Sequence, residues 1–117
     1  MRFFLFCCKL NLYMDRIEKL HQFLNIEPND PFTLYCLAME YENIDIKKSI
    51  FYYQKLLNEH ESYTGTYYHS AKIFNLIGEK EEAERIYKKG IEITLKLRKT
   101  KNHQELQRAY QAFLNDE

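Results

Sequence analysis

Apolar side chains recur every three or four residues along most of this chain, which is the period of an amphipathic helix. The first such face holds Ile17, Leu20, Phe23 and Leu24. No segment alternates apolar and polar side chains for long enough to predict a strand. The pattern therefore predicts an all-α fold. Its helices are expected over residues 15–24, 31–43 and 45–59, from the turn at 62–66 to residue 77, and over 80–97 and 102–114.

Capping residues indicate where these helices begin and end. Asp30 precedes a proline, a pair typical of an N-cap followed by the first helical position. Asp45 is the expected cap of the following helix, and Gly78 is expected to end the helix that starts after residue 66. Asn102 followed by Glu105 predicts a capping box at the start of the last helix.

Two stretches of the chain repeat one pattern at a distance of 33 residues, from Leu34 to Tyr67. Large, small and aromatic side chains follow one another in the same order in both. The first stretch contains Leu34, Leu37, Ala38, Tyr41, Ser49, Tyr53 and Leu56, and the second contains Tyr67, Ser70, Ala71, Phe74, Gly78, Ala83, Tyr87 and Gly90. A period of this length is typical of stacked helical pairs that bury their apolar faces on one another. It favours a binding surface over a catalytic pocket.

These residues resemble the tetratricopeptide repeat family, whose unit of about 34 residues is a helix–turn–helix. The second copy, residues 64–95, carries the family's large, small, aromatic and glycine positions, and departs from them at Ser70 and Leu95. The first copy, residues 31–62, has a turn one residue shorter, Asp45 in place of the glycine and Ser49 in place of an alanine. The resemblance covers residues 14–97.

The resemblance implies an all-α, right-handed α-α superhelix of tetratricopeptide-type helical hairpins with a C-terminal capping helix. It implies a single domain over residues 14–117. Its expected parts are a half-repeat at 15–30, repeats at 31–63 and 64–97, and a capping helix at 102–115.

Residues 1–13 allow several interpretations. Their apolar run, Phe3 to Cys8, is shorter than a signal peptide requires and far shorter than a membrane span. The segment is expected to be an N-terminal tail or an over-extended start, with Met14 as the initiator and Asp15 as a helix cap. A truncated first helix of a leading repeat is the other interpretation.

Composition narrows the classes of function. The chain of 117 residues has 17 basic and 17 acidic side chains, so no bulk attraction to nucleic acids or anionic membranes is expected. Cys7, Cys8 and Cys36 form no Cys-x-x-Cys pair and predict no disulfide framework, which favours a reducing, cytoplasmic location. The histidines have no metal-ligand spacing. The sequence predicts no metal, no cofactor and no catalytic motif, and therefore no enzyme.

The family resemblance also implies a partner-binding groove along the first helix of each repeat. The positions that would line it are Tyr35, Met39, Glu42 and Asn43 in the first copy and Tyr68, His69, Lys72 and Asn75 in the second. Members that bind chaperone tails hold a terminal carboxylate with Lys, Asn and Arg. Here Tyr35 and Met39 replace the expected Lys and Asn, which disfavours that ligand. The alternative is that these side chains face solvent or pack on the terminal helix.

The sequence thus predicts a non-catalytic interaction module that binds a peptide or helix of a partner protein. A structural alternative is self-association into a homo-oligomer through an uncovered front edge that includes Phe23 and Leu24. A weaker alternative is binding of a nucleic acid or an acidic partner through the basic stretch at residues 88–101.

Overall fold

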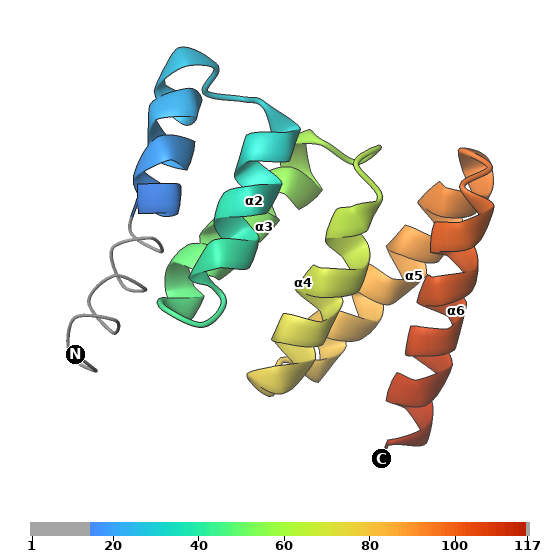
Figure 1. Ribbon diagram of the computed structural model, residues 1–117. Helices are drawn as coiled ribbons and strands as arrows, with labels where there is room; N and C mark the ends of the chain where they lie inside the picture. Colours follow the sequence, from blue (N-terminus) through green and yellow to red (C-terminus); the bar gives the residue numbers. More distant parts are fainter. Residues whose placement is uncertain (1–14, 117) are drawn as a thin grey trace, which may run out of the picture. The chain divides into compact units, whose positions relative to one another are not determined.

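The computed structural model describes residues 15–116, and every regular element in this range is a helix (Figure 1). The first described helix covers residues 15–26. It is followed by α2 (Pro31–Tyr41), α3 (Ile46–Glu59), α4 (Gly65–Leu76), α5 (Lys80–Lys96) and α6 (Thr100–Asn115). The predicted all-α fold is confirmed. The interpretations of residues 1–13 and of Met14 lie outside the described residues.

The chain divides into two compact units, one ending at Tyr52 and the other beginning at Tyr53. In the first unit, Asp30 caps α2 as predicted: its carboxylate accepts from the Thr33 backbone N–H at 3.0 Å and from the Thr33 hydroxyl at 2.7 Å. Asp45 caps α3 through the Lys48 N–H. Both caps satisfy N–H groups that the first turn of a helix leaves unpaired.

A serine stands at a small core position of the first unit without loss of hydrogen bonding. Ser49 is fully buried, and its hydroxyl donates to the Ala38 carbonyl at 2.6 Å. Because the buried hydroxyl is paired, the usual cost of burying a polar group is avoided. This contact explains how the chain accommodates serine where the family has alanine.

Hydrogen-bonded, aromatic and charged side chains connect the helix over residues 15–26 to the rest of the first unit. His21 Nε2 lies 2.9 Å from the Tyr41 hydroxyl, and the Tyr41 and Tyr52 rings stack at 6.0 Å. Arg16 pairs with Glu40 at 3.0 Å. Burial, followed by the neighbouring Tyr41, raises the pKa of Tyr52.

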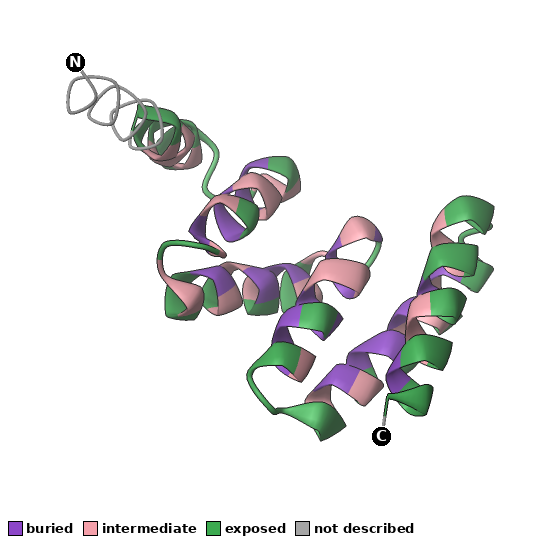
Figure 2. Cartoon of the chain, turned by 60° about the horizontal axis from the view of Figure 1, so that its bottom comes forward, coloured by how far each residue is buried: buried purple, intermediate pink, exposed green. Residues whose placement is uncertain are grey.

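The second unit packs α4, α5 and α6 against one another. The three helices approach one another closely at Gly90 on α5. A Cβ atom built there would lie 2.6 Å from Tyr67 Cβ and 3.0 Å from Leu106 Cδ1. Buried side chains from all three helices form the core around this point (Figure 2): Tyr67, Ala71, Phe74, Ala83, Ile86, Tyr87, Leu106 and Phe113.

The structure corrects three predictions about helix starts. Asp15 is already helical and pairs with Lys19, so it does not precede the helix as a cap. Gly65, expected in the turn, is the first residue of α4. The capping box at Asn102 is also wrong, because α6 begins two residues earlier, at Thr100. The Asn102 amide instead donates to the Thr64 hydroxyl at the start of α4.

Both α4 and α5 end in the same hydrogen-bonded turn. After α4, Gly78 has a φ of 88°, and the Glu79 N–H donates to the Phe74 carbonyl at 2.8 Å. After α5, Arg98 has a φ of 59°, and the Lys99 N–H donates to the Thr94 carbonyl at 2.9 Å. This is the Schellman arrangement, in which the left-handed residue is usually glycine. Arg98 takes that conformation at a steric cost that glycine avoids.

The close contact at Gly90 predicts that Gly90→Ala destabilises the chain. Alanine gains about 1 kcal/mol in helix propensity, but its methyl group would overlap the Tyr67 Cβ, which has no freedom to move aside. Overpacking typically costs about 1–3 kcal/mol. We expect a net loss in the free energy of unfolding, measured by urea denaturation. A variant at least as stable as the wild type would contradict this account of the α4–α5–α6 contact.

Gly78 and Arg98, the two residues with positive φ, predict stability changes of opposite sign when glycine is removed at one and introduced at the other. Gly78→Ala should destabilise by about 1 kcal/mol, because alanine is strained at positive φ although its methyl group would meet no atom within 4 Å. Arg98→Gly should stabilise by about 0.5–1 kcal/mol, since it relieves the same strain. Thermal denaturation of the two variants beside the wild type measures both. Shifts of the same sign would refute the assignment.

The Tyr67 hydroxyl predicts a pH effect on stability. Tyr67 is 1% exposed and donates to the Glu61 carbonyl at 2.8 Å, and burial, followed by the Glu61 charge, raises its pKa from 10.0 to about 12. Because folding holds this phenol protonated, its contribution is complete below about pH 10 and is lost as the pH rises towards 12. Urea denaturation should show the wild type losing stability more steeply across this range than Tyr67→Phe. Parallel curves would exclude Tyr67 as the titrating group.

Candidate functional site

The predicted groove residues of the first copy lie on α2 and just after it. Tyr35 is half-buried and Met39 is exposed, both within the helix. Glu42 and Asn43 were expected in the helix, but α2 ends at Tyr41 and Glu42 is its C-cap. These four residues belong to the first unit, and the set on α4 belongs to the second.

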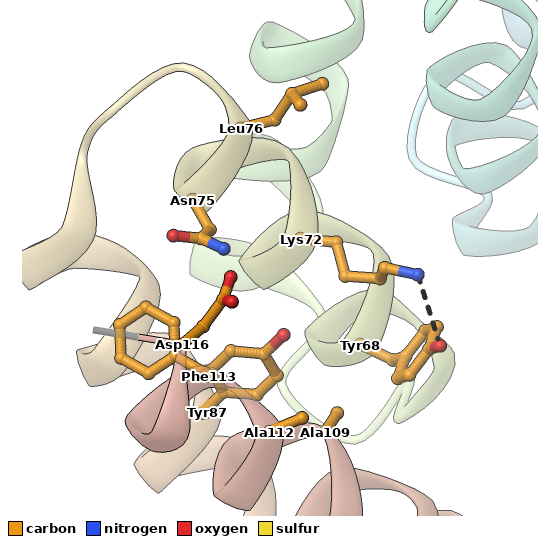
Figure 3. Close-up of a pocket in the computed structure, with 9 residues that line it drawn as sticks. All are labelled: Tyr68, Lys72, Asn75, Leu76, Tyr87, Ala109, Ala112, Phe113 and Asp116. Carbon is orange, nitrogen blue, oxygen red and sulfur yellow. Dashed lines mark hydrogen bonds between the residues drawn. The ribbon is translucent and has the colours of Figure 1, made fainter.

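Three of the four predicted α4 residues, Tyr68, Lys72 and Asn75, line one pocket of about 470 Å³ in the second unit (Figure 3). Leu76 completes the α4 side. The rest of the lining comes from α5 and α6: Tyr87, Ala109, Ala112, Phe113 and Asp116. The pocket thus has aromatic and small apolar side chains inside and three polar side chains from α4 and α6.

The fourth predicted residue, His69, lines a second pocket of about 580 Å³. Tyr68 and Ala109 belong to both pockets, and Glu105 and Arg108 complete the second one. The Tyr68 and His69 rings meet edge to face at 5.4 Å. The structure therefore brings all four predicted α4 residues together beside α6.

Helix periodicity explains this placement. On α4, Tyr67, Ala71 and Phe74 face the core. Each lining residue of α4 follows one of these core residues by one or two positions. The lining therefore forms a stripe beside the buried stripe of the helix. On α6, Leu106 and Phe113 are buried, and the lining residues other than Phe113 lie in the next stripe. Small side chains at Ala109 and Ala112 leave the space that the pocket occupies.

Lys72 is held against the ring of Tyr68. Its ammonium lies 5.1 Å from the ring centroid and 3.4 Å from the Tyr68 hydroxyl. The contact draws the Lys72 side chain back by about one turn towards the start of α4, as the dashed line in Figure 3 shows. A cation over an aromatic face at an exposed position contributes about 0.5–1 kcal/mol.

Tyr87 supplies a polar group to the wall of the first pocket. Its ring packs against Phe113 at 5.5 Å and Tyr110 at 5.9 Å, and the residue is 3% exposed. Burial, followed by the nearby Tyr68, raises its pKa. The hydroxyl therefore stays protonated at neutral pH and is a hydrogen-bond donor.

The sequence interpretation missed the α6 wall and the role of Tyr87. The sequence pattern places Tyr87 only among the repeated positions of the second copy and predicts the last helix only as a capping helix. A signal was present, because Ala109 and Ala112 lie three residues apart beside the apolar face of that helix. Small side chains there cannot fill the space next to a neighbouring helix.

Several charged side chains of α5 are paired, including two from the basic stretch. Glu82 pairs with Arg85 and Glu84 with Lys88, and Lys89 pairs with Glu61 at 2.6 Å. These contacts lower the pKa of Glu82, Glu84 and Glu61. Within the described part of the chain, no group of three His, Cys, Asp or Glu side chains could hold a metal ion, and no helix has the length and apolarity to cross a membrane.

The chain is similar to solved helical-repeat proteins. A tetratricopeptide repeat domain protein from Salinibacter ruber, in a crystal structure, is 31% identical with a TM-score of 0.70, and the match covers 75% of this chain and 99% of that one. A solution structure of such a protein from the same organism is 32% identical with a TM-score of 0.73, covering 77% and 92%. MamA, at 21% identity and a TM-score of 0.63, covers 92% and 70%, and shares the fold.

No protein-family model matches the chain, and no curated protein matches it. The identity to the Salinibacter ruber domain extends over nearly all of that domain. Together with the helical pairs and the pattern that repeats after 33 residues, this identity shows that the chain belongs to the tetratricopeptide repeat family.

Proposed function

We propose that this protein is a non-catalytic scaffold that binds a peptide or helix of a partner protein. The observation that carries the proposal is the convergence of Tyr68, Lys72 and Asn75 on one pocket with apolar walls. Concave sites of this size with a few polar side chains are typical binding sites. Aromatic side chains that are held rigidly by packing, such as Tyr87 and Phe113, form a fixed wall that loses little conformational entropy on binding.

The binding surface centres on the groove between α4 and α6. Leu76 extends it, because this leucine is 80% exposed at the edge of the pocket. Tyr35, Met39, Glu42 and Asn43 of the first unit are proposed as further contact residues. The proposed location is the cytoplasm, which suits the half-buried free thiol of Cys36.

Self-association is a second candidate, favoured by apolar exposure in the first unit. Phe23 is 60% exposed and Ile26 is 77% exposed on the helix over residues 15–26, and Phe32 on α2 is also exposed. Exposed apolar side chains of this size favour contact with another protein surface. The basic stretch is a weaker candidate, because Lys88 and Lys89 are already paired with glutamates.

A photo-crosslinking amino acid at position 76 tests the proposal in native extract. The matched control places it at Leu95, an equally apolar residue that is 67% exposed near the end of α5 and lines neither pocket. We expect a crosslinked partner from position 76 and none from position 95. Lys72→Glu should reduce the yield about tenfold, as a loss of about 1.4 kcal/mol would, whereas Lys101→Glu should not.

Three outcomes would contradict the groove as the binding surface. Equal adducts from positions 76 and 95 would indicate contact without specificity. An adduct that is insensitive to Lys72→Glu would move the site to another face. An adduct of twice the mass of the chain would favour self-association.

A further inference from the structure

The basic stretch at residues 88–101 divides into a paired and an unpaired part. Its first two cations lie within α5 and are paired with glutamates. The others lie at the turn between α5 and α6 (Figure 1), which we call the basic turn, residues 95–101. All four are exposed, and within residues 15–116 none of them forms an ion pair: Lys96, Arg98, Lys99 and Lys101. Because they are so close in the chain, their positive potentials add.

Acidic side chains near the basic turn do not neutralise it. Glu61 is already paired with Lys89 at 2.6 Å, and the charge of Lys96 contributes less than Lys89 to lowering its pKa. Glu92 and Glu105 lie one turn beyond the cluster on α5 and α6, and neither forms an ion pair in the described part of the chain. The turn therefore carries a local positive charge, although the whole chain has none.

Two leucines lie among these cations. Leu95 is 67% exposed and Leu97 is 41% exposed. No residue of the basic turn lines either pocket of the second unit, so the groove does not account for their exposure. The turn has no aromatic side chain on which a nucleic acid base could stack. Cations combined with exposed aliphatic side chains instead favour contact with anionic lipid headgroups and the acyl chains beneath them.

The turn after α4 has the same backbone arrangement and different chemistry. Ile77 and Leu97 are the C-caps of α4 and α5, and they are 43% and 41% exposed. The next residue is Gly78 in the first turn and Arg98 in the second, both with positive φ. An acidic residue follows in the first turn and a basic one in the second. The basic turn thus carries a cation where glycine would be unstrained, and strain of this kind is concentrated at functional positions.

We propose that the basic turn contacts the surface of an anionic lipid bilayer. Leu95 and Leu97 enter the boundary between headgroups and acyl chains, and the four cations lie among the anionic headgroups. The long aliphatic stems of lysine and arginine allow their charged ends to remain in water beside the inserted leucines. This peripheral contact needs no membrane-spanning helix. It goes beyond the proposed function, because the turn and the groove use different residues.

Flotation of the full chain with lipid vesicles tests the inference. One set of vesicles contains phosphatidylcholine alone, and the other contains about one third phosphatidylserine. We expect binding to the anionic vesicles to be at least about tenfold tighter than to the neutral ones, and to weaken in high salt, which screens the charges. Glycerophosphoserine, the soluble headgroup, should not compete, because it offers no apolar layer to the leucines. A single-stranded RNA oligonucleotide is tested as an alternative ligand.

Matched substitutions in the two turns assign the contact to named side chains. Arg98→Gly should weaken binding to the anionic vesicles about fivefold, the effect of about 1 kcal/mol, although it should stabilise the fold. Lys99→Gln should have a similar effect, whereas Lys80→Gln, in the turn after α4, should have none. Leu97→Gln should weaken binding about tenfold, and Ile77→Gln, at the equivalent C-cap, should not change it. Thermal denaturation confirms that each variant is folded.

Equal binding to the two kinds of vesicle, or no binding to either, would overturn the inference. Binding that neither Arg98→Gly nor Leu97→Gln weakens would place the contact elsewhere and would also overturn it. Competition by glycerophosphoserine would indicate a headgroup site that does not need a bilayer. Binding of the oligonucleotide without binding of vesicles would assign the turn to nucleic acids. No protein partner is present in these assays, so their result is independent of the proposed groove.

Discussion

The second unit depends on the close approach of three helices at Gly90. The absence of a side chain lets the α5 backbone lie against Tyr67 of α4 and Leu106 of α6, at distances that a Cβ atom would not allow. Because interiors are packed as densely as crystals, this contact determines how far α4 and α6 lie from α5. The width of the space between α4 and α6 follows from it, and so does the groove.

Several polar side chains inside this packing are paired with carbonyl groups of the same or the next helix. Ser70 donates to the Thr66 carbonyl at 2.6 Å, and Thr94 donates to the Gly90 carbonyl at 2.8 Å. His103 Nδ1 lies 3.1 Å from both the Ile91 carbonyl and the Thr94 hydroxyl. These bonds let small hydroxyl side chains be buried where helices pack, and they connect α5 to α6.

The groove arises because one stripe of α6 covers the core of the second unit and the neighbouring stripe lines the groove. Leu106 and Phe113 bury the apolar side of the repeat, as an array requires at its end. The neighbouring stripe of the same helix carries Ala109 and Ala112, whose small side chains leave α4 uncovered there. Aromatic walls and a few unpaired polar groups remain accessible as a result. A fold built for stacking thus leaves a groove beside its last helix.

The sequence alone predicted the presence of the helices, and through the family resemblance it predicted the α4 residues that line the groove. Both depend on spacing along the chain that a helix converts into a face. Asp30, Asp45 and Gly78 end or begin helices through contacts within a few residues, and periodicity places Tyr68, Lys72 and Asn75 on one stripe. Only the tertiary structure decided the start of α6, the left-handed turn at Arg98 and the α6 wall of the groove. Asn102 bonds to Thr64, which lies 38 residues away. Such partners are selected by packing between helices, for which local spacing carries no signal.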